Sequence, residues 1–151
     1  MKKEFRQFIR KQYKIFLPEI IISNGRISPY SIHNWASTFT PIENNMWGFI
    51  RFLGLKMYPQ FPISKYFIDF ADPIKKIGIE VDGKEYHKDL LKDEVRQNEL
   101  ENLGWIIYRF SGRETYLDCE LQKFYEFENE DDEQEKPECF CVECQLKRIF
   151  F

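Results

Sequence analysis

Two stretches in the middle of the chain alternate between apolar and polar residues with a period of two, the pattern of a β-strand with one buried face. They cover residues 66–71 and 77–82. Asp72-Pro73 between them has turn chemistry, because Pro73 fixes φ and Asp72 can bond its own backbone. We therefore predict a β-hairpin, and the stretch 63–87 around it organises the rest of the chain. Its apolar positions are Tyr66, Ile68, Phe70, Ile77, Ile79 and Val81.

A basic amphipathic helix is predicted at the start of the chain, where apolar residues recur at helical spacing with Lys and Arg between them. Pro18 is expected to end it, because a proline in a helix interior lacks the required N–H. Residues 19–23 with Asn24-Gly25 then indicate a short strand and a tight turn. The helix is interpreted as packing on the core. The alternatives are an arm that contacts phosphates and a surface for a protein partner or a second copy of the chain.

A second helix has a clear start signal. Thr40 suits the N-cap, Pro41 suits the first turn, and Glu43 occupies the capping-box position. The carboxylate of Glu43 can therefore accept a bond from the Thr40 amide, which explains Glu43 without any catalytic role. The apolar stripe of this second helix consists of Ile42, Met46, Phe49, Ile50 and Leu53.

A third helix is predicted over residues 88–103, ending before Gly104, which is a favoured residue just past a helix. Asp93 and Arg96 stand three residues apart in it, which predicts a surface ion pair. The residues expected to face inward are Leu91, Val95, Leu100 and Leu103.

The mostly apolar stretch 105–110 predicts a third strand in the middle of a mixed sheet. The order helix, strand, strand, helix, strand predicts an α/β fold in which helices flank a small sheet. Residues 117–127 indicate a last helix. We expect an N-terminal helix and extension over 1–37, a core over 38–125, and an acidic linker with a cysteine-containing tail over 126–151.

Charge is spread unevenly along the 151 residues, whose formal net charge is −3. Residues 126–138 contain eight acids and one base; the remainder has 21 Lys and Arg against 17 Asp and Glu, a net charge of +4. The body is therefore compatible with an anionic partner, and the acidic run is predicted to fold over the body and weaken binding of that partner, the alternative being a solubilising linker. The sequence shows no membrane span and no signal-peptide core, so a cytoplasmic protein with reduced or metal-bound cysteines is expected.

Three acids gather on the predicted hairpin. Glu80 and Asp82 share one face of their strand, and Asp69 joins them if the hairpin pairs its carboxylate face with theirs. Acids on an apolar hairpin are costly unless they are paired or bind a cation. A Mg²⁺ site for phosphodiester hydrolysis is the leading interpretation, with Asp82 as a further ligand or base. The alternative is a structural acid pair satisfied by Lys65, Lys75 or Lys76.

His87 follows the hairpin closely and could orient water, protonate a leaving oxygen or contact phosphate; the alternative is a role in starting the next helix. His33, the only other histidine, is interpreted as structural. The chain contains no GxxxxGK[ST], GxSxG or HExxH motif. A nucleotide kinase, a nucleophilic hydrolase and a zincin are therefore unsupported.

An ordered set of motifs resembles the very-short-patch-repair-like endonuclease domains of the restriction-endonuclease-like PD-(D/E)XK superfamily, over about residues 38–115. The motifs are Thr40-Pro41-Ile42-Glu43…Met46-Trp47, Gln60-Phe61-Pro62-Ile63, Tyr66-Phe67-Ile68-Asp69-Phe70, Ile79-Glu80-Val81-Asp82-Gly83…His87, Asp93-Glu94-Val95-Arg96…Leu100 and Gly104-Trp105-Ile106-Ile107-Tyr108-Arg109-Phe110. The resemblance implies an α/β/α nuclease core and Mg²⁺- or Mn²⁺-dependent cleavage of DNA.

The same resemblance implies roles for single residues. Asp69 looks like the metal ligand, Glu80 like the acid of the split E-x-K element, Glu43 like the first-helix glutamate of the metal shell, and His87 like the histidine after the strand. Asp82 stands where the wider superfamily has the E-x-K lysine, which leaves the general base unassigned. Gln60 is either near the site or a solvated turn residue. Two function classes stay open: an active endonuclease, and a nucleic-acid-binding or interaction module that keeps the fold without turnover.

The cysteines near the end of the chain have metal-ligand spacing. Cys139, Cys141 and Cys144 supply three donors, and a tetrahedral Zn²⁺ site needs a fourth. Cys119 is the only other cysteine in the chain. A structural zinc site, a half-site completed by a second chain, and thiols in a mobile tail are the three interpretations.

Overall fold

The computed structural model describes residues 2–83, 89–117 and 139–151. Four strands form one mixed sheet in the order β1-β2-β3-β4. β1 and β2 are antiparallel, as are β2 and β3, whereas β3 and β4 are parallel. The strands are β1 (Tyr58–Ile63), β2 (Tyr66–Asp72), β3 (Ile77–Asp82) and β4 (Ile106–Ser111). The helices are α1 (Lys3–Ile22), α2 (Pro41–Phe52), α3 (Leu90–Asn102) and α5 (Val142–Phe150), with short 3-10 turns at Pro29–Ser31, Trp35–Ser37 and Glu114–Tyr116.

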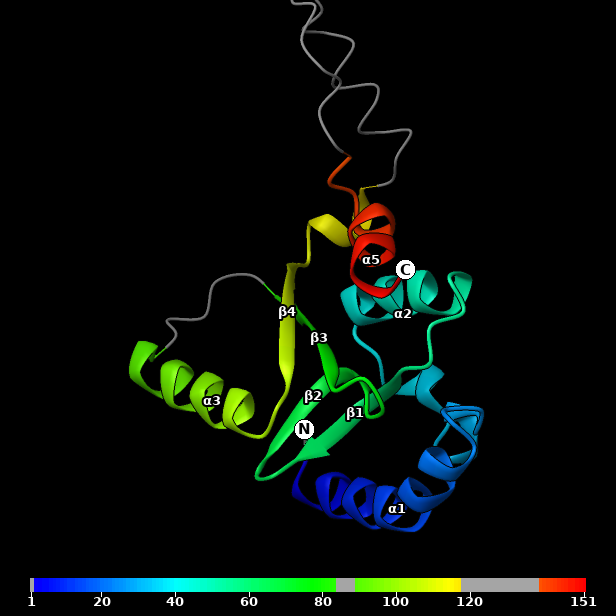
Figure 1. Ribbon diagram of the computed structural model, residues 1–151. Helices are drawn as coiled ribbons and strands as arrows, with labels where there is room; N and C mark the ends of the chain where they lie inside the picture. Colours follow the sequence, from blue (N-terminus) through cyan, green and yellow to red (C-terminus); the bar gives the residue numbers. More distant parts are fainter. Residues whose placement is uncertain (1, 84–88, 118–138) are drawn as a thin grey trace, which may run out of the picture.

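Helices lie on both faces of the sheet (Figure 1). On one face, Ile9 and Tyr13 of α1 and Leu100 of α3 pack with Ile68 of β2 in one apolar cluster. On the other face, α2 and α5 pack with Phe70, Ile79 and Val81 in a second cluster, to which α5 contributes Val142 and Leu146. The predicted α/β fold, a small mixed sheet flanked by helices, is confirmed. None of the described helices is both long enough and apolar enough to cross a membrane.

The prediction that Pro18 ends the first helix is wrong. Pro18 lies inside α1, and residues 19–22, predicted as a strand, continue the helix. Ile20 is fully buried in the core, and the free energy gained by its packing outweighs the hydrogen bond that Pro18 cannot make, so the helix continues past the proline. The helix ends at Ile22; Asn24 and Gly25 beyond it have φ of 55° and 75°, and the Gly25 amide donates to Ile20 O at 2.8 Å.

Strand β1 was not predicted, because Pro59 and Pro62 break the alternating pattern. β1 is an edge strand, the place in a sheet where prolines are tolerated, because an N–H on its outer side makes no ladder bond. The strand predicted over 105–110 is also an edge strand rather than a central one: within the described residues it pairs with β3 alone.

Two helical predictions need correction. On α3 only Leu100 is buried, whereas Leu91, Val95 and Leu103, predicted to face inward, are exposed. Within the predicted tail, α5 is a helix that begins at the N-cap Cys141 and buries Val142 and Leu146 against the second apolar cluster. The predicted helix over 117–127 and the acidic run 126–138 lie outside the described residues, apart from Leu117, which is extended.

Gly78 allows β2, β3 and β4 to approach one another closely. A Cβ at this position would lie 2.6 Å from Ile107 Cδ1 and 2.8 Å from Ile68 Cγ2. We expect Gly78→Ala to lower the free energy of unfolding by about 1–3 kcal/mol, the usual cost of overpacking a core. Gly48→Ala is the matched control, because a Cβ there meets nothing within 4 Å and alanine favours a helix. Equal urea midpoints for Gly78→Ala and the parent would contradict this packing.

Candidate active site

Glu43 reaches the site through the start of α2. The predicted capping box is present: Glu43 N–H donates to Thr40 Oγ1 at 3.4 Å, and Thr40 N–H donates to Glu43 Oε2 at 3.3 Å. Ile42 beside it packs toward two glycines, because a Cβ on Gly112 would lie 3.0 Å from Ile42 Cγ2 and one on Gly83 4.0 Å from Ile42 Cδ1. Small residues after β3 and β4 therefore let the start of α2, and Glu43 with it, approach the ends of both strands.

Asp69 is the most perturbed carboxyl among the described residues. Its Oδ2 accepts a hydrogen bond of 2.9 Å from Val81 N–H on β3. Burial raises the pKa of Asp69 from its ordinary 3.8 to about 7, the Val81 bond opposes the shift, and the negative charges of Glu80, Glu43 and Asp82 add to it. Glu80, Glu43 and Asp82 thus lie within electrostatic reach of Asp69; the strand-face argument predicted this proximity for Glu80 and Asp82, and the family resemblance for Glu43.

Gln60 lies opposite Asp69 if the β1–β2 register, which pairs Pro59 with Phe70 and Phe61 with Ile68, is continued between them. It is only 8% exposed, so it is not a solvated turn residue. Its φ of 48° is unusual for a non-glycine residue inside a strand. Strained backbone of this kind concentrates at functional sites, so its φ and its burial keep Gln60 as a candidate residue of the site.

Glu80 is held by two arginines rather than by lysines. Arg96 of α3 donates to both carboxylate oxygens of Glu80, to Oε2 at 3.0 Å and to Oε1 through a shorter bond. Arg109 of β4, the register partner of Glu80, lies 3.8 Å from Oε2. Burial would lower the pKa of Arg96, but the hydrogen bond and charge of Glu80, with Asp69 and Asp93, raise it. Arg96 is therefore a fixed cation at this site.

The ion pair predicted between Asp93 and Arg96 is replaced by two others. Arg96 bonds Glu80, and Asp93 instead lies 3.4 Å from Arg109 Nη1. The lysines considered as structural partners of the hairpin acids also bind elsewhere. Lys65 lies 3.8 Å from Glu99, Lys75 Nζ donates to Phe150 O, and Lys76 Nζ donates to Leu103 O.

The pairing of Glu80 with arginines was missed by the sequence analysis, although a signal exists. Arg109 interrupts an otherwise apolar strand, and a cation in such a place requires an acid on a neighbouring strand. The position of Arg96 was harder to anticipate, because it depends on how α3 packs across the sheet.

Of the two histidines, the structure describes only His33. His87 lies in the stretch 84–88, outside the described residues. His33 bonds Thr38 Oγ1 at 2.9 Å and makes edge contacts with the rings of Phe5, Phe8 and Trp35. Its surroundings agree with the predicted structural role.

Three cysteines converge at the start of α5. The sulfurs of Cys139, Cys141 and Cys144 lie within 4.8 Å of one another, and Cys141 is buried. Among the described residues, this is the one group of three or more His, Cys, Asp or Glu side chains whose ligand atoms all lie within 4.8 Å of one another. The carboxylates of Asp69, Glu80, Glu43 and Asp82 are spread more widely. The expected fourth cysteine, Cys119, lies outside the described residues.

The carboxylate group fits a hard divalent cation. Its donors are oxygens, which Mg²⁺ and Mn²⁺ prefer, and they stand on rigid strands and on a capped helix start. Burial first, and then the charges of the neighbouring acids, disfavour the ionised form of Asp69, and a bound cation would offset both effects. The fold and site together define a mixed α/β protein with an acid cluster at one end of its sheet.

Comparison with known proteins names the family. The chain belongs to the REase_MTES_1575 family, a restriction-endonuclease-like family, which it matches over residues 43–124. It is 31% identical over 80 residues to the uncharacterized protein YcjD of Escherichia coli strain K12, covering 51% of this chain and 67% of YcjD. It is 33% identical over 95 residues to an uncharacterized protein of Haemophilus influenzae, covering 58% of this chain and 78% of that protein. Among solved structures, the catalytic domain of the homing endonuclease I-Bth0305I is similar, with a TM-score of 0.47 and 20% identity over 59% of this chain and 94% of that domain.

Proposed function

We propose that this protein is a metal-dependent DNA endonuclease of the very-short-patch-repair-like group. The observation that carries the proposal is the half-buried Asp69, which accepts the Val81 N–H bond and whose pKa is raised to about 7 by burial and by the charges of Glu80, Glu43 and Asp82. A clustered set of acids with a perturbed pKa marks a functional site more often than a structural one. Membership of a restriction-endonuclease-like family supports cleavage of DNA.

Asp69 and Glu80 would hold the cation, with Glu43 at the edge of its shell. When bound, Mg²⁺ or Mn²⁺ would offset the charge that builds up on a phosphodiester during hydrolysis and would activate water. The chain's own residues prepare the site: Val81 N–H orients Asp69, and the capping box orients Glu43. Arg96 and Arg109 fix Glu80 and supply the positive charge that Asp82, in the usual lysine position, cannot.

Nicking of supercoiled plasmid distinguishes this function from a nucleic-acid-binding module without turnover. We expect the full chain to convert supercoiled plasmid to the open circle in Mg²⁺ or Mn²⁺ and to stop in EDTA. Binding of the plasmid without nicking in either metal, over a range of pH, would favour the binding module instead.

His87 is proposed to act as a general acid–base group. A neutral imidazole near pH 7 can accept or relay a proton, and no E-x-K lysine is available for this task. We expect His87→Ala to keep Mn²⁺ and DNA binding but to lower the cleavage rate by roughly 10²-fold or more. A variant that loses thermal stability yet cleaves at the parent's rate per folded molecule would reduce His87 to a structural role.

We also propose that Cys139, Cys141 and Cys144 hold a structural Zn²⁺, with Cys119 or a donor from a second chain as the fourth ligand. The proximity of the three sulfurs supports this. Purified protein should contain about one zinc per chain, and Cys144→Ser should lose the metal and lower the melting temperature. If the purified protein contains no zinc and Cys144→Ser melts at the same temperature as the parent, the three cysteines are ordinary thiols.

A further inference from the structure

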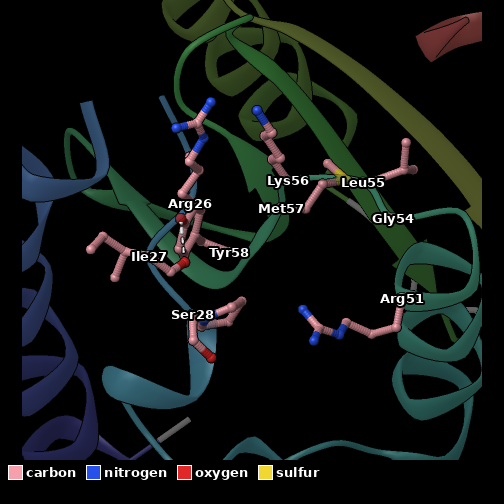
Figure 2. A pocket seen from close by; sticks show the side chains of 11 residues that line it. Arg26, Ile27, Ser28, Arg51, Gly54, Leu55, Lys56, Met57 and Tyr58 are labelled. Carbon is pink, nitrogen blue, oxygen red and sulfur yellow. Dashed lines mark hydrogen bonds between the residues drawn. The ribbon is translucent and has the colours of Figure 1, made fainter. Parts of the chain in front are cut away.

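A basic pocket lies away from the acids, between the loop that follows α1, the end of α2 and the start of β1 (Figure 2). Its volume is about 310 Å³, the space of about ten water molecules at ~30 Å³ each. The pocket is therefore large enough for a ligand bigger than a single phosphate group. Three cations line it, and the described residues of its wall include no Asp or Glu. The residues used below are Arg26, Ser28, Arg51, Lys56, Met57 and Tyr58.

Arg51 is held in place before any ligand binds. Its guanidinium lies over the rings of Tyr30 and Trp47, 5.7 and 5.5 Å from their centroids, and Trp47 Nε1 donates to the Tyr30 hydroxyl at 2.9 Å. Figure 2 shows its side chain reaching from α2 toward Ser28. Stacking uses the faces of the guanidinium and leaves its N–H edges for a planar or phosphate-like acceptor.

Arg26 and Lys56 form a second positive group on the pocket. Lys56 packs over Gly25, where an added Cβ would lie 3.0 Å from its Cδ, and its Nζ donates to Asn24 O at 2.9 Å. That bond uses one of the three ammonium donors and leaves two. Figure 2 shows Arg26 and Lys56 projecting alongside each other. Ser28 Oγ accepts from Tyr30 N–H and keeps its own proton to donate.

The remaining wall is apolar and fixed. Met57 and Tyr58 are buried, and the Tyr58 hydroxyl donates to Ile27 O at 2.7 Å, which ties β1 to the loop. A pocket that combines cations with an apolar wall suits a ligand with a charged group and a less polar body. The C-terminal end of α2 carries roughly half a negative charge from the helix dipole, which disfavours an anion, but the three full positive charges of the pocket outweigh it.

We infer that this basic pocket binds a phosphate-bearing nucleotide of the nucleic-acid strand on which the acid cluster acts. Arg51 lies eight residues after Glu43, about 12 Å along α2 at 1.5 Å per residue, a rise of three to four nucleotides at about 3.4 Å each. Glu43 lies in the first turn of α2 and Arg51 in the last, so a strand that reached both would span the length of the helix. The inference rests on a nucleic-acid substrate but needs no metal or cleavage.

The test is a titration of the full chain in EDTA with a 5′-phosphorylated tri-thymidine, followed by the backbone amide signals of Gly25, Ser28 and Gly54. We expect these signals to shift on saturation. Arg26→Ala with Lys56→Ala should weaken binding roughly tenfold or more. The control pair Lys11→Ala with Lys14→Ala removes the same charge from exposed positions of α1 and should weaken it much less. Both pairs replace exposed side chains, so unchanged melting temperatures should accompany them.

Several results would overturn the inference. The first two are amide shifts that persist unchanged in Arg26→Ala with Lys56→Ala, and equal weakening of trinucleotide binding by both pairs of substitutions. The other two are amide shifts caused by inorganic phosphate but not by the trinucleotide, and binding of a peptide of residues 126–138 in the pocket instead of the trinucleotide. Because the titration contains no metal, a pocket that binds the trinucleotide in a protein that never nicks plasmid would refute the endonuclease alone. A nicking enzyme whose pocket stays silent would refute the pocket alone.

Discussion

Asp69→Asn is expected to reduce cleavage of plasmid by at least about 10³-fold, since loss of several kcal/mol of charge stabilisation corresponds to at least three factors of ten. Asparagine keeps an oxygen that can accept the Val81 N–H bond, so the fold should persist. The measurement is the nicking rate at saturating Mn²⁺. Glu99→Gln is the control, because it removes one charge from a half-exposed acid that pairs with Lys65. Cleavage by Asp69→Asn within tenfold of the parent would contradict the assignment.

The same variant should change how stability depends on pH. The pKa of Asp69 is about 7 in the folded protein against an ordinary 3.8, so the folded state holds a proton that the unfolded chain has lost between these values. Stability of the parent should therefore fall as pH rises from about 4 to about 7, by at most about 4 kcal/mol at ~1.36 kcal/mol per pKa unit. The difference between parent and Asp69→Asn isolates this effect. A difference that is flat across the window would show that Asp69 ionises normally.

Arg96→Gln is expected to lower the free energy of unfolding by about 3 kcal/mol, because it leaves the buried Glu80 without its two-bond partner. Glu80 is only 8% exposed, so water cannot replace the guanidinium. Urea unfolding at pH 7 measures the loss. Arg109→Gln is the matched control: this arginine lies farther from Glu80, at 3.8 Å, and should cost less.

A double-mutant cycle assigns that loss to the pair. Glu80→Gln combined with Arg96→Gln should cost clearly less than the sum of the single changes, because no charge is then left buried alone. Additive costs would mean that Arg96 stabilises the fold through packing instead.

Local signals in the sequence predicted the parts of the fold that depend on neighbouring residues. The capping box from Thr40 to Glu43 and the strands around Asp72-Pro73 appear as expected. Strand β1 escaped because its prolines hide the alternation, and their tolerance depends on an edge position that only the assembled sheet defines.

The candidate site was predictable as a set of acids but not as a network. Period-two alternation placed Glu80 and Asp82 on one face, hairpin pairing was expected to bring Asp69 to them, and the family resemblance named Glu43; in the structure the charges of the other three acids act on Asp69. Arg96 was interpreted as the partner of Asp93 because helix spacing favours near neighbours, whereas packing of α3 turns it toward Glu80. Long-range pairs of this kind leave no local pattern. The basic pocket likewise joins residues from three segments.

Calorimetric titration with Mn²⁺ tests the central claim most directly, since that claim is that Asp69, Glu80 and Glu43 hold one divalent cation. Mn²⁺ prefers oxygen donors, so the cysteine group should contribute little. The account predicts about one bound ion per chain, retention of binding in Glu99→Gln and its loss in Asp69→Asn. Equal binding of Mn²⁺ by Asp69→Asn and the parent would contradict the account.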